Sequence, residues 1–299
     1  MSQFSSDLLE TPVPYDIVVC VKQVPDTANI TSDAMTPEGT VNRSALPAIF
    51  NPEDLHALET ALEIKDRFGG TVTCVTMGLP KAANVLRECL YRGADRVILL
   101  TDRRAAASDT LATSYILSQV VKTVGKFDIV LCGRQAIDGD TAQVGPQIAE
   151  KLAIPQITYL EQVIDADDKT ITVRRNTGSG WEVVKSQLPC LITVLDTANE
   201  PRPLSACKTL KYRFARVPGE LAPEAEEEKA KLEQKGLLLE QWSLDDVNAD
   251  LNRCGLAGSP TKVFKVLSIV LTKEGFKNVE PTEEGINGLI HELVEDKTL

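Results

Sequence analysis

Short apolar runs alternate with amphipathic stretches over the first half of the chain. Runs rich in β-branched residues are typical of strands buried on both faces of a parallel sheet, and four occur, at Asp16–Val21, Thr71–Met77, Arg96–Leu100 and Phe127–Cys132. The stretches between and after them predict helices at 51–68, Ala82–Tyr91, Thr110–Val124 and Thr141–Leu152. This order predicts an α/β fold with a doubly wound, mostly parallel sheet.

The first predicted helix has clear boundary signals. Asn51 is suited to cap its free amides, and Pro52 fits the first helical position. Glu53 and Asp54 favour the positive end of the helix dipole. Two glycines after Phe68 predict its end. Before this helix, the polar segment 25–47 predicts a small hairpin around a turn at 37–39.

The pattern changes after Pro155. Strand-like segments separated by turns predict an antiparallel addition to the sheet, at Ile157–Ile164, Thr170–Arg175, Trp181–Lys185 and Cys190–Leu195. The later chain predicts a charged helix at Glu224–Gln234, an amphipathic stretch at Leu244–Leu251 and a final helix at Thr282–Asp296. We therefore expect a flexible leader over 1–15, an α/β domain over 16–198 and an extended C-terminal arm over 199–299.

Charge and hydropathy exclude two classes of partner. The 299 residues include 43 acidic and 32 basic ones, a formal net charge of -11, which opposes binding to nucleic acid or anionic lipid. No apolar run approaches the ~20 residues that cross a bilayer. The N-terminal sequence lacks the basic start, apolar run and cleavage site of a signal peptide. We expect a cytoplasmic protein without a membrane span.

Cysteine and histidine usage gives little support to residue-based catalysis. The seven cysteines form no CxxC pair, and several lie in apolar runs, so we expect reduced, structural thiols. Only His56 and His291 occur, far apart in sequence. Histidine-rich metal sites and Ser-His or Cys-His catalysis are therefore not expected. We assign no catalytic residue and no metal.

The most informative segment follows the fourth strand, at 133–146. Open parallel sheets bind ligands at the carboxyl ends of their strands, and this loop offers a glycine and the free amides of a helix start, which suit phosphate. The alternative is that Asp140 or Thr141 only caps the helix. The common dinucleotide and P-loop motifs are absent. The run Asp138-Gly139-Asp140 lacks the further oxygen ligands of a calcium loop.

Two cations and one helix start lie at the same predicted edge. Lys22 follows the first strand and Arg134 follows the fourth, and we favour Arg134 as the phosphate contact. Asp109, Thr110 and Thr113 begin a helix; they either cap it or contact the ligand, and the cap is favoured.

Six motifs in order closely resemble the beta subunit of electron-transfer flavoproteins, in particular its electron-bifurcating and nitrogen-fixation-associated branch. The motifs are VVCVKQVPD, NPEDLHALETAL, VTMG, YRGADRVILLTD, SDTLATS and GRQAIDGDTAQVGP. The resemblance runs from about Asp16 to Asn199, and the last motif is the most specific. It implies an adenine-nucleotide hydrolase-like Rossmannoid domain in a heterodimer whose alpha subunit carries one FAD.

The resemblance also implies a nucleotide bound by this chain. In bifurcating members that nucleotide is a second FAD, which accepts hydride from NADH and sends one electron to ferredoxin or flavodoxin and the other to the alpha-subunit FAD, which feeds a dehydrogenase. The small residues of the GDTAQVG and SDTLATS segments favour this type. The alternative is a non-bifurcating shuttle with structural AMP. A universal-stress-type nucleotide-binding protein is a third reading, but it needs neither the long tail nor SDTLATS.

Family contacts carried over residue by residue give the candidate cofactor site. Adenine and ribose contacts fall on Cys20, Asn51, Met77 and Gly78. Phosphate contacts fall on the run Asp138, Gly139, Asp140, Thr141, Ala142, Gln143 and Val144, and extensions toward the flavin or the pyrophosphate fall on Thr110, Thr113, Arg134 and Gln135.

The resemblance to known family members also bears on the partners. The segment 199–202 matches the family's loop for recognising an acyl-CoA or similar dehydrogenase, although Ala198 replaces the bulky apolar anchor of ordinary shuttles. We expect the arm after it to wrap the alpha subunit. The Glu-rich insert near Glu224 departs from the compact family pattern.

Overall fold

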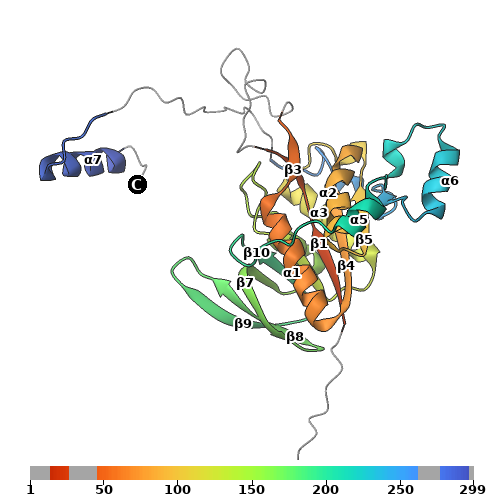
Figure 1. Ribbon diagram of the computed structural model, residues 1–299, viewed down its shortest axis with the longest axis horizontal. Coiled ribbons are helices and arrows are strands. Elements are labelled where there is room, and N and C mark those ends of the chain that lie inside the picture. Colours follow the sequence, from red (N-terminus) through yellow and green to blue (C-terminus); the bar gives the residue numbers. More distant parts are fainter. Residues whose placement is uncertain (1–13, 27–45, 262–276, 296–299) are drawn as a thin grey trace, which may run out of the picture.

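A computed structural model describes residues 14–26, 46–261 and 277–295. Its centre is a nine-stranded sheet in the order β11-β5-β4-β1-β6-β10-β7-β8-β9 (Figure 1). The strands from β11 to β7 pair in parallel: β11 (Glu240–Trp242), β5 (Arg96–Leu100), β4 (Gly70–Met77), β1 (Tyr15–Cys20), β6 (Ile129–Gly133), β10 (Cys190–Val194) and β7 (Gln156–Ala166). The predicted α/β class and mostly parallel sheet are confirmed.

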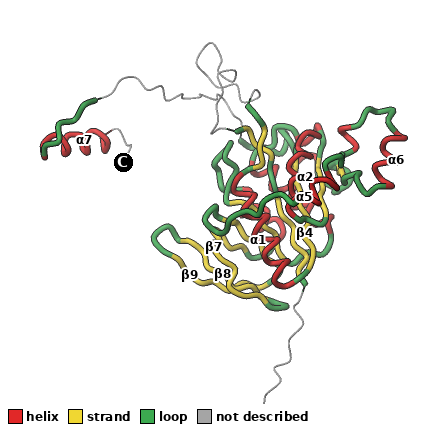
Figure 2. The backbone as a smooth tube through the Cα atoms, viewed as in Figure 1, coloured by secondary structure: helices red, strands yellow, loops and turns green. Residues whose placement is uncertain are grey.

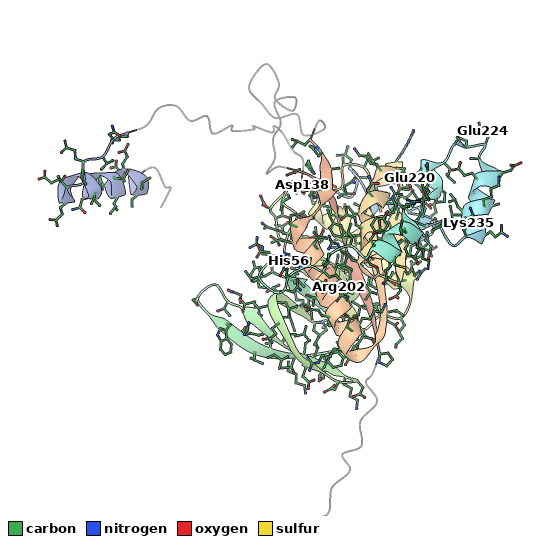
Figure 3. All side chains as sticks on the ribbon, in the orientation of Figure 1. His56, Asp138, Arg202, Glu220, Glu224 and Lys235 are labelled. Atoms are coloured by element: carbon green, nitrogen blue, oxygen red, sulfur yellow. The ribbon has the colours of Figure 1, made fainter. Side chains whose placement is uncertain are left out.

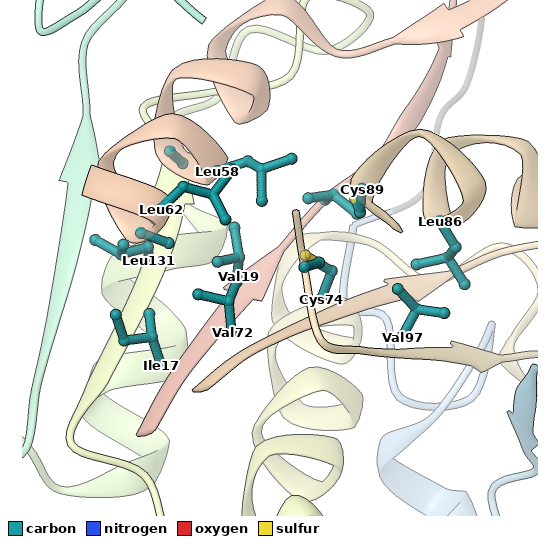
Figure 4. Close-up of a cluster of buried hydrophobic side chains, with 14 of the residues drawn as sticks. Ile17, Val19, Leu58, Leu62, Val72, Cys74, Leu86, Cys89, Val97 and Leu131 are labelled. Carbon is teal, nitrogen blue, oxygen red and sulfur yellow. The ribbon is translucent and has the colours of Figure 1, made fainter. Parts of the chain in front are cut away.

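Helices cover both faces of this sheet. One face carries α1 (Pro52–Phe68) and α2 (Ala83–Arg92), and the other carries α3 (Thr110–Val124) and α4 (Val144–Leu152). Adjacent residues of β1 serve the two sides: Val19 packs in the cluster with Leu58 and Leu62 of α1 (Figure 4), whereas Val18 packs with Ile116 of α3. Burial on both faces explains the continuous apolar runs.

The antiparallel addition is smaller than the sequence predicts. Strand β8 (Thr170–Asn176) pairs antiparallel with β7, and β9 (Trp181–Gln187) pairs antiparallel with β8. Both extend the sheet beyond the helices (Figure 2). The strand predicted at Cys190–Leu195 is confirmed as β10, but its place in the antiparallel addition is wrong, because β10 lies between β6 and β7 and is parallel to both. All five residues of β10 are buried, as expected for a strand covered on both faces.

A second, two-stranded sheet flanks the start of α1. Strands β2 (Gln23–Pro25) and β3 (Ala48–Phe50) pair antiparallel, with Gln23 opposite Phe50. They flank the polar segment 25–47 that predicts a hairpin. The turn predicted at 37–39 and most of the leader lie outside the described residues.

Much of the C-terminal third packs on the main sheet. Helix α5 (Ala206–Tyr212) lies against α2, and β11 is the edge strand beside β5. The stretch Leu244–Leu251 forms no α-helix, and its Leu244 and Val247 are buried in the core on the α3 side. The charged α6 (Glu226–Gln234) is confirmed, and it projects between the labelled Glu224 and Lys235 (Figure 3).

The predicted final helix is α7 (Glu283–Glu295), drawn apart from the sheet in Figure 1. None of its residues is buried, and Ile286, Ile290 and Val294 are exposed along one side. Across the described ranges, no helix combines the length and the apolar character needed to span a membrane.

Candidate functional site

A cavity of about 390 Å³ opens at the carboxyl edge of the parallel strands. Its wall is built from the ends of β1, β4 and β6, the start of α3 and the loop before α4. Cys20 and Cys132 lie opposite each other on β1 and β6. A hydrogen bond with Cys20 and burial raise the pKa of the Cys132 thiol, so Cys132 is uncharged at neutral pH.

The loop between β6 and α4 has an unusual backbone. Helix α4 begins at Val144, three residues later than the sequence predicts, and its first turn has no side-chain cap. Asp140 and Thr141 therefore do not cap it. Asp140 and Ala142 have positive φ angles of 48° and 51°, a conformation that costs non-glycine residues energy and that clusters at ligand sites. Uncapped amides at a helix start favour an anion.

Residues at the start of α1 hold the loop between β6 and α4 in place. Asn51 makes no side-chain cap to α1, which corrects the predicted role. Its side chain instead donates from Nδ2 to the Gln135 carbonyl at 2.9 Å and accepts the Ile137 amide on Oδ1 at 3.2 Å. The predicted contact residue Asn51 thus fixes the loop and does not line the cavity.

Two acidic residues of the same turn, Glu53 and Asp54, are buried. Asp54 accepts the Lys22 amide at 2.8 Å and the Gly133 amide at 3.1 Å, so one carboxyl joins the ends of β1 and β6. Burial raises the pKa of Asp54 to about 7, although these hydrogen bonds oppose the shift. Glu53 accepts the Gln135 amide at 2.9 Å.

The two cationic side chains at the site, Arg134 and Lys22, differ in their ion-pair partners and in exposure. Arg134 donates from Nη2 to buried Glu53 at 2.6 Å, and this pairing raises the pKa of Arg134. Lys22 Nζ contacts both carboxylate oxygens of Asp138, at 2.7 and 2.9 Å. Its side chain is 49% exposed.

The start of α3 forms the opposite wall. Asp109 caps this helix by accepting the Ala112 amide, as favoured from the sequence. Thr110 donates from its hydroxyl to Gln143 Oε1 at 2.8 Å, which joins the two walls. A residue near the end of the sheet domain also holds the start of α3, because buried Ser259 accepts the Asp109 amide at 2.8 Å.

The structure brings most of the predicted site residues together. Those lining the cavity are Cys20, Met77, Thr110, Thr113, Arg134, Gln135, Gly139, Asp140, Thr141, Ala142, Gln143 and Val144. Asn51, Gly78 and Asp138 lie outside the lining. Sequence reasoning missed Asp54 and Ser259. Asp54 was explained by the helix dipole alone, and its place in the wall depends on the approach of α1 to β6.

Comparison with known proteins identifies the family. The electron transfer flavoprotein domain model matches residues 38–233. The chain belongs to the electron transfer flavoprotein family. It is 42% identical to the electron transfer flavoprotein subunit beta of Clostridium acetobutylicum, over 94% of this chain and 98% of the relative. These matches confirm the resemblance drawn from the motifs.

Two further relatives come from named systems. Protein FixA of Sinorhizobium fredii is 43% identical over 93% of this chain and 92% of its own. The caffeyl-CoA reductase-Etf complex subunit CarD of Acetobacterium woodii is 45% identical over 84% of this chain and 87% of its own. The chain is therefore similar to both relatives over most of their length.

Proposed function

We propose that this chain binds FAD in the cavity at the carboxyl edge of the sheet and acts in a bifurcating heterodimer. Bound FAD would supply the redox chemistry, taking hydride from NADH and sending one electron to ferredoxin or flavodoxin and one to the alpha-subunit FAD. The chain's own residues bind and orient the cofactor. We place the complex in the cytoplasm.

The observation that carries the proposal is the loop from Gly133 to Gly145. Its left-handed residues and the uncapped start of α4 line the cavity. Amides at a helix start stabilise phosphate through hydrogen bonds and the helix dipole. Cys20 and Cys132, which line the cavity on neighbouring strands, suit contact with an adenine ring.

The size of the cavity bears on whether the bound nucleotide is FAD or AMP. About 390 Å³ is near the lower end of the ~300–1,000 Å³ of small-molecule sites. This volume would suit the adenosine phosphate part of FAD, and the flavin part would need space beyond the cavity. AMP as a structural ligand therefore stays the alternative function.

The names of the relatives support assembly with other subunits. CarD is named as a subunit of a caffeyl-CoA reductase-Etf complex. For this chain we propose an alpha subunit, bound by the segment beyond residue 261, and an acyl-CoA or similar dehydrogenase. Leu204, Leu210 and Phe214, which follow the segment 199–202, are 44 to 63% exposed, which suits contact with a protein partner.

The deciding experiment counts nucleotides. The heterodimer with its alpha subunit is denatured, and the released nucleotides are separated and quantified. Two FAD per heterodimer support bifurcation. One FAD and one AMP support the alternative, a non-bifurcating shuttle with structural AMP. In the first case, anaerobic mixing with NADH should bleach flavin absorbance without any dehydrogenase present. Absence of that bleaching in a two-FAD heterodimer rejects NADH as the donor.

A further inference from the structure

Lys22 combines a fixed backbone with a movable side chain. Its amide donates to buried Asp54 at 2.8 Å, and its carbonyl oxygen accepts the Asn51 amide at 2.9 Å. Both bonds hold the Cα at the end of β1. The side chain is half-exposed and borders the cavity. The ammonium group is therefore anchored at the site but can exchange its partner.

The present partner of Lys22 is Asp138, which lies in the loop after β6 (Figure 3). Exposed ion pairs contribute little to stability, because water competes with the carboxylate and the lysine loses side-chain entropy. A phosphate that is also held by the amides at the start of α4 carries more charge than one carboxylate. It is the stronger partner for the ammonium group.

Arg134 cannot make the same exchange. Its partner Glu53 is 5% exposed and also accepts the Gln135 amide. Moving the guanidinium to a ligand would leave a buried carboxylate without its cation, which is strongly destabilising. The pairing with Glu53 therefore holds the Arg134 side chain against α1.

We propose that Lys22 binds the phosphate of an adenine nucleotide in this cavity and leaves Asp138 when it does so. The inference rests on the proposed nucleotide site. Asp138 then competes with the nucleotide for one cation, so the two residues of a single ion pair have opposite effects on binding. An ion pair that only stabilises the loop would give effects of the same sign.

The test uses the heterodimer with its alpha subunit, exchanged against labelled AMP, with adenosine as a probe that lacks phosphate. Lys22→Gln should weaken AMP binding about tenfold and leave adenosine binding within about twofold. Asp138→Asn should tighten AMP binding about two- to fivefold, because its competing charge is gone. The dependence of AMP binding on salt should be smaller in Lys22→Gln than in the unmodified protein.

The matched control is Lys126→Gln. Lys126 is another exposed lysine paired with aspartates, Asp16 and Asp128, but at the opposite edge of the sheet. It should bind AMP as the unmodified protein does. Unchanged AMP affinity in Lys22→Gln, or equal weakening in Lys22→Gln and Asp138→Asn, overturns the inference. If the unmodified protein binds neither AMP nor adenosine, the nucleotide site itself is rejected.

Discussion

Asp54 Oδ1 accepts the amide of Gly133 at 3.1 Å, across 79 residues of sequence. The contact exists because residue 133 has no side chain: a Cβ there would lie 2.5 Å from Asp54 Oδ1 and 2.8 Å from the Asp54 amide nitrogen. The first turn of α1 therefore sits directly on the end of β6. Since Asp54 also holds the Lys22 amide, one buried carboxyl sets the distance between two strand ends at the cavity.

Gly133→Ala should lower the free energy of unfolding by about 1–3 kcal/mol, because the added methyl group meets backbone atoms of α1 that cannot rotate away. Chemical denaturation measures the change. Gly180→Ala is the matched control, since a Cβ at residue 180 meets no atom within 4 Å. Equal stability of the two variants would contradict the close approach of α1 to β6.

The raised pKa of Asp54 predicts a pH dependence of stability. The folded state holds the proton up to pH about 7, whereas the unfolded state releases it near 3.8. The folded state thus binds more protons between these values, and stability falls as pH rises. Three pKa units correspond to about 4 kcal/mol.

Asp54→Asn removes this titration. The unfolding free energy of the variant minus that of the unmodified protein should therefore increase by a few kcal/mol from pH 4 to pH 8, measured by urea denaturation at each pH. A difference that stays constant with pH would show that the carboxyl titrates normally in the folded protein.

Gly139→Val should leave the fold intact and prevent nucleotide binding. A Cβ at residue 139 meets no protein atom within 4 Å, so the larger side chain extends into open space at the cavity wall. Folding is checked by the thermal midpoint, and binding by nucleotide content of the heterodimer. Gly180→Val is the control. Full nucleotide occupancy in Gly139→Val would mean that the ligand does not approach this loop.

The fold was largely readable from the sequence because its strands are short, apolar and separated by helices with strong end signals. The sequence predicts the strand Cys190–Val194 but not its direction in the sheet. Periodicity reports that a strand is buried, whereas its partners depend on where the chain returns to the sheet. The same limit applies to β11, because its three residues pair with β5, a strand far away in the sequence.

The site was readable where a loop follows a strand, since topology alone places such loops at one edge. The contacts that Asn51 and Arg134 make could not be predicted from the sequence. Each has a local explanation that the sequence favours, a helix cap and a phosphate contact. The structure shows a tertiary contact for each that the sequence does not indicate, Asn51 with Gln135 and Arg134 with Glu53. Such contacts depend on the packing angle of α1, which no local pattern encodes.

The part of the predicted arm that follows Thr261 is best tested by a chain that ends at this residue. A chain ending at Leu195 would lose β11 and the buried Val217, Leu239 and Leu244, so it should unfold and would report nothing about assembly. Ending at Thr261 keeps the whole sheet and its bond from the Thr261 amide to Asp109. It removes α7, whose apolar side chains are exposed.

This shortened chain should keep a thermal midpoint within a few degrees of the full chain and fail to copurify with the alpha subunit. The physical reason is that exposed Ile286, Ile290 and Val294 gain stabilisation only by covering their apolar surface with a partner. A full-length variant with these three residues changed to Ser separates the helix face from chain length, and it should also lose the alpha subunit. Copurification at the unmodified level in both proteins would place the heterodimer contact on the sheet domain instead of the arm.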